Sequence, residues 1–301
     1  MSTLVMGVVN VTTDSFSDGG RYLDTGAAIS HGLALWAAGA DILDVGGEST
    51  RPGAERVDPS IERDRVVPVI RALAQRGAWI SIDTMNASTA LAAVDSGARI
   101  VNDVSGGLAD AAMLPAVAET DAEIILGHWR GPSREMYAPA QYADVAAEVA
   151  AELAERVAAA RTAGIDPDRI IVDPGIGFGK RPEQNWEVLR ALPDLVAAGQ
   201  RVLLGTSRKR FLAEALAEAS VDAERRFAGR TGAAAVRAGG EDSSSDTVGA
   251  VSEARRDTAT AVTSALAARA GVWGVRVHDV AGTRDALRIA QLWGGSDAAA
   301  R

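Results

Sequence analysis

Three acidic or amide side chains end short apolar runs that lie far apart in the chain. They are Asp83, Asn102 and Asp173, which follow the runs 79–82, 100–101 and 170–172. Carboxylate oxygens accept hydrogen bonds, and an amide both accepts and donates them. If the three side chains converge, they match a flat array of ring N–H and amine donors, such as a guanidine-like edge. A converged set would therefore bind a planar, nitrogen-rich molecule.

A pair of nitrogen-bearing side chains occurs near the end of the chain. Arg276 and His278 are separated by one residue in an apolar run. Residues two apart on a strand point to the same side, so both side chains face one way while Val275 and Val277 face into packing. Arginine and histidine donate hydrogen bonds to anions. The spacing predicts a site for a phosphate-bearing group.

The segment 10–20 is too polar and rich in turn residues to belong to a core, yet it directly follows an apolar run. It contains Phe16 among Ser and Asp residues, and it carries Asn10 and Asp18, whose oxygen atoms suit a hard metal ion. We expect a lid over a charged substrate. The alternative is a surface turn whose Ser and Asp side chains bond to the local backbone.

The same strand–helix unit positions all of these groups. The apolar runs are 6–9, 42–45, 79–82, 100–101, 123–127, 170–172, 202–205 and 275–277, and helical patterns occupy 25–38, 61–75, 87–96, 142–163, 182–192, 209–219, 257–270 and 283–293. Eight such units predict the α/β class and a (β/α)8 TIM barrel in a single domain. An open doubly wound sheet is the alternative, but no Gly-x-Gly-x-x-Gly turn follows the first run. In a barrel all strand ends open onto one face, where sites are built.

Two regions depart from this alternation. The segment 220–256 is rich in Gly, Ser and Asp with little apolar periodicity, so we expect a flexible loop insertion. The tail 295–301 is small and polar and is expected to fray. Trp36, Trp186 and Trp293 fall on helical patterns, and we expect all three to be core contacts.

Composition narrows the class of protein. The 301 residues are 47% hydrophobic and carry a formal net charge of −9, which argues against nucleic acid as a partner. There is no cysteine, so disulfide and thiolate chemistry are excluded. No apolar run is long enough to span a membrane, and the first strand begins too early to leave room for a signal peptide. We expect a cytoplasmic protein with neither a membrane nor a nucleic-acid partner.

Seven motifs carry a resemblance to a known family. They are the segment 10–20, Asp44-Val-Gly-Gly-Glu-Ser-Thr-Arg-Pro-Gly53, Ser81-Ile-Asp-Thr84, Val101-Asn-Asp-Val-Ser-Gly-Gly107, Asp173-Pro-Gly-Ile-Gly-Phe-Gly-Lys180, Ser207-Arg-Lys209 and Arg276-Val-His-Asp279. In this order, over about 6–293 apart from 220–256, they resemble the dihydropteroate synthases, a pterin-binding family. The resemblance implies a transferase of folate biosynthesis that joins 6-hydroxymethyl-7,8-dihydropterin diphosphate to p-aminobenzoate and releases diphosphate. Sulfonamides block that step.

The resemblance also implies a role for each site residue. The pterin ligands would be Asp83, Asn102, Asp173 and Lys209, of which Asp83, Asp173 and Lys209 would be catalytic. The diphosphate would be held by Asn10, Arg276 and His278, and a Mg²⁺ ion by Asn10 and Asp18. The p-aminobenzoate pocket would consist of Phe16, Thr50, Arg51, Pro52, Phe178 and Ser207.

Two other functions remain open at this point. A pterin-dependent methyltransferase with a corrinoid partner shares the barrel and the pterin contacts, but it has no use for the anion site at Arg276 and His278. A non-catalytic pterin-binding paralogue would be expected to have lost loop residues or diphosphate ligands, and the candidates are all present here. By resemblance we also expect a homodimer.

Overall fold

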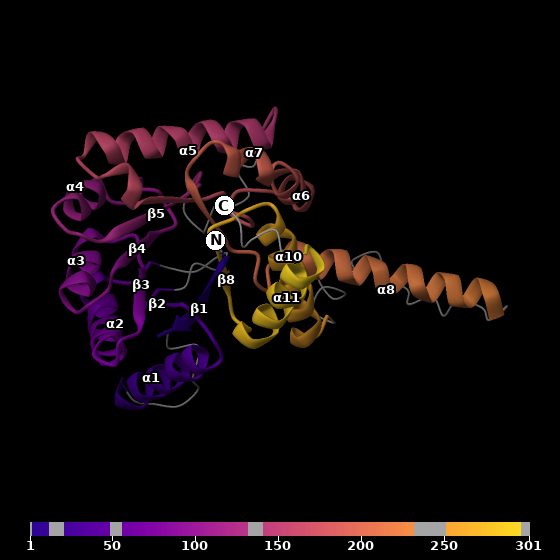
Figure 1. Cartoon of the computed structure of the whole chain (residues 1–301), viewed down its shortest axis with the longest axis horizontal. Helices are drawn as coiled ribbons and strands as arrows, with labels where there is room; N and C mark the ends of the chain where they lie inside the picture. The colour runs from indigo at the N-terminus through magenta and orange to yellow at the C-terminus, as the bar shows by residue number, and fades with distance from the viewer. Residues whose placement is uncertain (1, 12–20, 49–55, 132–140, 232–250, 296–301) are drawn as a thin grey trace.

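Eight parallel strands close into a barrel in chain order, with β8 pairing β1 (Figure 1). The computed structural model describes residues 2–11, 21–48, 56–131, 141–231 and 251–295. The strands are β1 (Leu4–Asn10), β2 (Ile42–Gly46), β3 (Trp79–Asp83), β4 (Ile100–Asp103), β5 (Glu123–Gly127), β6 (Ile170–Asp173), β7 (Arg201–Leu204) and β8 (Gly274–Val277). The predicted (β/α)8 barrel is confirmed, and the open sheet is excluded.

Helices surround the barrel. They are α1 (Arg21–Ala37), α2 (Pro59–Ala74), α3 (Ala87–Asp95), α4 (Met113–Ala118), α5 (Val145–Thr162), α6 (Pro182–Arg190), α7 (Leu192–Ala197), α8 (Arg210–Thr231), α10 (Glu253–Arg269) and α11 (Val280–Trp293). Side-chain caps set several starts: Asp58 accepts from Ser60 N before α2, and Asp144 accepts from Ala147 N before α5. The two six-residue helices α4 and α7 were not predicted, because they are too short to show a period.

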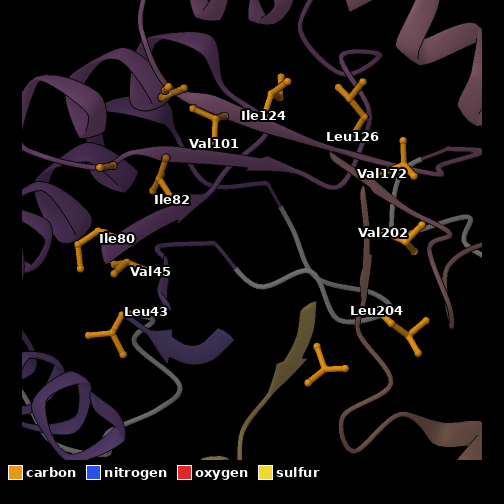
Figure 2. Close-up of a cluster of buried hydrophobic side chains, with 14 of the residues drawn as sticks. Leu43, Val45, Ile80, Ile82, Val101, Ile124, Leu126, Val172, Val202 and Leu204 are labelled. Atoms are coloured by element: carbon orange, nitrogen blue, oxygen red, sulfur yellow. The ribbon is translucent and has the colours of Figure 1, made fainter. Parts of the chain in front are cut away.

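Successive residues of each strand face opposite sides of the barrel wall. Outward side chains pack beneath the helices, and Figure 2 shows this layer with Leu43, Ile80 and Val101 on neighbouring strands. Inward side chains fill the barrel with a separate apolar layer of Met6, Ile42, Ile100, Ile125, Ile171 and Leu203. Both faces of the sheet are therefore covered, which explains why the strands read as almost continuous Val, Ile and Leu.

The inward layer changes from apolar to polar within one strand period. Asp44, Asn102 and Asp173 each stand two residues after Ile42, Ile100 and Ile171, so each points to the same side as those lumen residues. Asp173 ends β6 and Asn102 is the last residue but one of β4, while Asp44 lies in the middle of β2. The barrel therefore has an apolar plug below and a polar end above.

The predicted bounds of the loop 220–256 are wrong, because helices occupy both of its ends. Helix α8 continues to Thr231, and α10 begins at Glu253 with Ser252 as its cap. Residues 232–250 between them lie outside the described residues. The later turns of α8 extend away from the barrel (Figure 1). Apolar periodicity marks a helix that packs on a core, so its absence did not exclude a helix that projects from one.

The three tryptophans differ in their burial. Trp186 packs against the core and meets Phe211 edge-on at 4.9 Å between ring centroids, so its predicted core role is confirmed. Trp293 is 82% exposed at the end of α11 and Trp36 is 37% exposed on α1, so their predicted core roles are wrong. The helical period put Trp293 on a helix but could not say which face of that helix meets the barrel. None of the helices in the described parts of the chain is long and apolar enough to cross a membrane.

Candidate active site

An arginine lies between two carboxylates at the polar end of the barrel. Arg276 Nε is 2.6 Å from Asp44 Oδ2, and Arg276 Nη2 is 2.7 Å from Asp83 Oδ2. Asn102 Nδ2 also donates to Asp44 Oδ2, at 3.1 Å. These contacts join strands β2, β3, β4 and β8 through side chains alone. Asp83 and Asn102, two of the predicted ligands, are therefore brought together.

Burial dominates the electrostatics of this group. It raises the pKa of Asp83 to about 7, with Arg276 opposing the rise and Asp44 adding to it. Burial alone would lower the pKa of Arg276, but Asp44 and Asp83 outweigh it, so the pKa of Arg276 is raised and the guanidinium stays charged. The site therefore contains one fixed cation and a carboxylate that titrates near neutral pH.

Asp173 and Lys209 lie on the same rim as Arg276. A methyl group at Gly205 would lie 3.8 Å from Asp173 Oδ2, 3.9 Å from Lys209 Nζ and 3.8 Å from Arg276 Cβ. Gly175 N donates to Asp173 Oδ1 at 2.7 Å, which orients the carboxylate. Burial raises the pKa of Asp173, opposed by Lys209, and burial lowers the pKa of Lys209 to about 8, opposed by Asp173. All four predicted pterin ligands thus stand at one end of the barrel.

The turn after β7 contacts the residue that follows β8. The Ser207 hydroxyl accepts from His278 N at 3.1 Å and lies 2.9 Å from His278 Nδ1. Arg208, in a left-handed conformation at φ 57°, forms two bonds to Asp257 on α10, at 2.6 and 2.9 Å. The two bonds to Asp257 anchor Arg208, the residue of this turn that stands between Ser207 and Lys209.

The predicted facing of β8 is confirmed, since Val275 and Val277 belong to the outer core. Arg276 pairs with Asp44 and Asp83 rather than with its near neighbour Asp279, which caps α11 by accepting from Gly282 N at 3.1 Å.

The remaining predicted residues divide into two sets. Asn10 ends β1, half-buried, and the Phe178 ring lies with its centroid 4.6 Å from Lys209 Nζ. The others lie outside the described residues: Phe16, Asp18, Thr50, Arg51 and Pro52.

Comparison with known proteins identifies the family of this chain. The family model described as pterin binding enzyme matches residues 6–278. The chain belongs to the pterin-binding enzyme family. Within it, the chain is 52% identical over 290 residues to the dihydropteroate synthase of Mycobacterium leprae, covering 96% of this chain and 93% of that protein.

Two solved structures of the family share this fold closely. The dihydropteroate synthase of Xanthomonas albilineans with 4-aminobenzoic acid has a TM-score of 0.80 and 39% identity, covering 98% of this chain and 94% of that one. The same enzyme in complex with 7,8-dihydropteroate has a TM-score of 0.77 and 37% identity, with the same coverage of 98% and 94%.

One residue of this candidate site was not predicted from the sequence. Asp44 is fully buried and bonded to both Arg276 and Asn102, and its second oxygen, Oδ1, has no hydrogen-bond partner among the described residues. The signal was present, because Asp44 follows Ile42 with the spacing that relates Asp173 to Ile171. Asp44 is also the first residue of the polar motif 44–53, whose other residues continue into the loop after β2.

Proposed function

We propose that this chain is a transferase that condenses 6-hydroxymethyl-7,8-dihydropterin diphosphate with p-aminobenzoate, giving 7,8-dihydropteroate and diphosphate. The observation that carries the proposal is the gathering of buried carboxylates and an amide at the end of the barrel where Arg276 and Lys209 also lie. The relative from Mycobacterium leprae, similar over almost its whole length, carries the name dihydropteroate synthase.

The acidic side of the site suits the pterin ring. A pterin presents ring N–H and exocyclic amine donors along one flat edge, which matches the acceptors of Asp83, Asn102 and Asp173. The Arg276 guanidinium is itself a planar array of N–H donors, and it bonds Asp44 and Asp83 at 2.6 and 2.7 Å. These carboxylates are therefore placed to accept from such an array, and the unpartnered Asp44 Oδ1 adds a further buried acceptor.

The cationic side suits the leaving group. Arg276, His278 and Asn10 are the proposed diphosphate ligands, in the region where barrels commonly bind phosphate, after strands seven and eight. No group of three or more His, Asp or Glu side chains in the described parts of the chain would hold a metal ion by itself. Mg²⁺ usually takes one or two protein oxygens and completes its shell with phosphate and water. Asn10 and Asp18 fit that role, and the ion would neutralise charge on the diphosphate.

The reaction breaks the bond between the pterin methylene carbon and a diphosphate oxygen, and the electron pair leaves with the diphosphate. The amine nitrogen of p-aminobenzoate then forms the new C–N bond and loses a proton. Buried Asp83 and Asp173 stabilise positive charge that develops on the pterin, while Arg276 and His278 stabilise the departing anion. Preorganised charges of this kind make the largest single contribution to the rate enhancement of many enzymes. We expect no covalent intermediate on the protein.

The aromatic amine would lie between the sixth and seventh strand ends. Phe178 and Lys209 provide an apolar ring and a cation there, and Ser207 begins the turn that leads into α8. Phe16, Thr50, Arg51 and Pro52 complete the proposed pocket from the first and second loops. Recognition of a benzoate needs both an aromatic surface and donors for the carboxylate, and this set supplies both.

The direct test is to incubate the purified protein with the pterin diphosphate, p-aminobenzoate and Mg²⁺ and to measure dihydropteroate. We expect product from the wild type and at least about 100-fold less from Asp173→Asn, which loses one preorganised charge. A protein that binds pterin but makes no product would be the non-catalytic paralogue. Methyl transfer to or from a corrinoid partner instead of condensation would support the methyltransferase, which the anion site at Arg276 and His278 disfavours.

The same proposal covers assembly and location. We propose a homodimer of single-domain subunits in the cytoplasm. Five large apolar side chains, from 54% to 82% exposed, lie on the adjacent helices α10 and α11: Val262, Leu266, Ile289, Leu292 and Trp293. Exposed apolar surface of this kind marks an interaction site. Leu266→Glu with Ile289→Glu should yield monomers in sedimentation analysis, and Leu91→Glu on α3 is the matched control. A dimer unchanged by the double substitution would contradict this interface.

A further inference from the structure

A fully buried lysine lies immediately behind the proposed amine pocket. Lys180 ends the turn between β6 and α6, and it is 1% exposed. Its Nζ reaches His128 Nδ1 at 2.8 Å, the Gly175 carbonyl at 3.0 Å and the Phe178 carbonyl at 3.2 Å. An ammonium group has three N–H donors, so these three acceptors satisfy it completely.

The histidine beside Lys180 has a defined proton position. Because Lys180 donates to Nδ1, the hydrogen of the neutral His128 ring is on Nε2, which donates to Glu152 Oε2 at 2.9 Å. Burial and the nearby Lys180 lower the pKa of His128 to about 3, so a neutral ring is expected. Glu152 lies on α5 and also pairs with Arg130. A line of bonds therefore runs from α5 through His128 to Lys180.

Stability alone does not account for this ammonium. Burying a cation costs free energy unless a carboxylate compensates it closely. The three atoms that Lys180 bonds are neutral, and negative charge reaches it from Asp173 at longer range and from Glu152 beyond His128. Burial accordingly lowers the pKa of Lys180 to about 7. The ammonium group instead links two backbone carbonyls of one turn, those of Gly175 and Phe178, by donating to both.

That turn carries three groups of the proposed site. Gly175 N donates to Asp173, the Ile176 carbonyl accepts from Lys209 Nζ, and the Phe178 ring lies 4.6 Å from the same Nζ. Every second residue is a glycine with positive φ: 63° at Gly175, 80° at Gly177 and 58° at Gly179. Glycines leave the backbone many alternatives, so the shape of this turn depends on bonds made to it.

We propose that Lys180 is a positioning residue: by bonding His128 and the carbonyls of Gly175 and Phe178, it holds the 175–179 turn in the shape that places the Phe178 ring for the aromatic amine. The identity of that amine as p-aminobenzoate rests on the proposed function. Tyr142 supports the far end of the turn, where its hydroxyl donates to the Gly179 carbonyl at 3.0 Å.

The first measurement separates the two substrates. Lys180→Met keeps the length of the side chain but removes all three donors. We expect KM for p-aminobenzoate to rise about 10- to 100-fold, the scale of a small misplacement in an active site. The Kd of 6-hydroxymethyl-7,8-dihydropterin should rise clearly less than this KM, because Asp83 and Asn102 stand on other strands and Lys180 bonds neither Asp173 nor the Gly175 N–H that orients it. Equal losses for both ligands, or none for either, would overturn the proposal.

Two further variants make the comparison specific. In His128→Asn the amide oxygen can replace Nδ1 as acceptor, so KM for p-aminobenzoate should remain within about threefold of the wild type. Arg201→Met is the matched control. It removes a cation paired with Glu123 at 2.6 Å, at the opposite end of the barrel, and should leave KM unchanged. A rise in KM in the Arg201 variant as large as that in Lys180→Met would show that the effect is a general loss of stability.

The second measurement does not depend on turnover. The chain has four phenylalanines, so 4-fluorophenylalanine labelling gives four ¹⁹F signals, and Phe178→Leu assigns that of Phe178. Lys180→Met should shift the Phe178 signal while the buried Phe211 signal stays in place. If the Phe178 signal does not move, the positioning role is refuted, whether or not the wild type makes dihydropteroate. A wild type that makes no dihydropteroate would refute only the proposed function. If Lys180→Met does not fold, His128→Leu removes one acceptor and should shift the same signal.

Discussion

Arg276 bonds two carboxylates through two different nitrogens, and this geometry makes a sharp prediction for Arg276→Lys. The guanidinium reaches Asp44 through Nε at 2.6 Å and Asp83 through Nη2 at 2.7 Å. A lysine carries the same charge, but its ammonium is a point donor on a flexible stem and lacks the planar fork. We expect it to keep one of the two carboxylates and to lose the other.

The size of the loss follows from the bond that disappears. A hydrogen bond to a charged group contributes about 1.5–3 kcal/mol. Each 1.36 kcal/mol corresponds to about a tenfold change in rate. Arg276→Lys should therefore lower kcat/KM for the pterin diphosphate by about 10- to 150-fold. Arg276→Met loses both bonds and leaves Asp44 and Asp83 facing each other unpaired, so its loss should be larger still, at about 10²- to 10⁴-fold.

The assay is steady-state condensation with p-aminobenzoate saturating and the pterin diphosphate varied. Arg284→Lys is the matched control, because Arg284 likewise donates through Nε to the Gly39 carbonyl at 2.6 Å and pairs with Asp41, outside the site. We expect that variant to stay within about threefold of the wild type. Wild-type kcat/KM in Arg276→Lys, or an equal loss in Arg284→Lys, would refute the two-carboxylate argument.

Three further predictions address other parts of the site. Asp173→Ala should lower kcat/KM by at least about 100-fold without accumulating a covalent intermediate, as followed by product formation and intact-protein mass spectrometry. Because burial raises the pKa of Asp83 to about 7, that carboxyl gains a proton as pH falls through 7. Affinity for 6-hydroxymethyl-7,8-dihydropterin, measured by calorimetry, should therefore weaken by about tenfold per pH unit below that value, and a flat profile would contradict the assignment. Replacing 222–250 by a short Gly-Ser linker should leave kcat within about twofold. A deletion that extends through Glu253 should be worse, because Glu253 pairs with Arg208 at 2.9 Å.

Much of the site was predictable because it obeys one local rule. Residues two apart on a strand share a side, so the polar residue that follows an inward apolar one must face the same interior. Asp173 after Ile171 and Asn102 after Ile100 follow this rule, and Arg276 on β8 faces away from Val275 and Val277, which belong to the outer core. Parallel strands in a closed barrel then bring their carboxyl ends to one rim, whatever their separation in the chain.

Other features had no local signal. Helix α8 beyond Ser220 has no apolar period, because over its later turns it extends away from the barrel (Figure 1). Lys180 was visible only as the last residue of a motif. Its contact with His128 joins residues 52 apart, and that spacing carries no information about which acceptor a flexible side chain reaches.

The sequence by itself determined which residues face the interior and at which strand end they stand, since both follow from a period of two and from strand order. Only the tertiary structure decided which of them touch. The bond from Arg276 to Asp44 joins residues 232 apart, and it exists because the barrel closes and brings β8 beside β1, with β2 next to it. The side-chain torsions determine which carboxylate each nitrogen of Arg276 bonds. Burial then raises the pKa of the buried carboxyl group of Asp83. Those are properties of the assembled barrel, which no single strand contains.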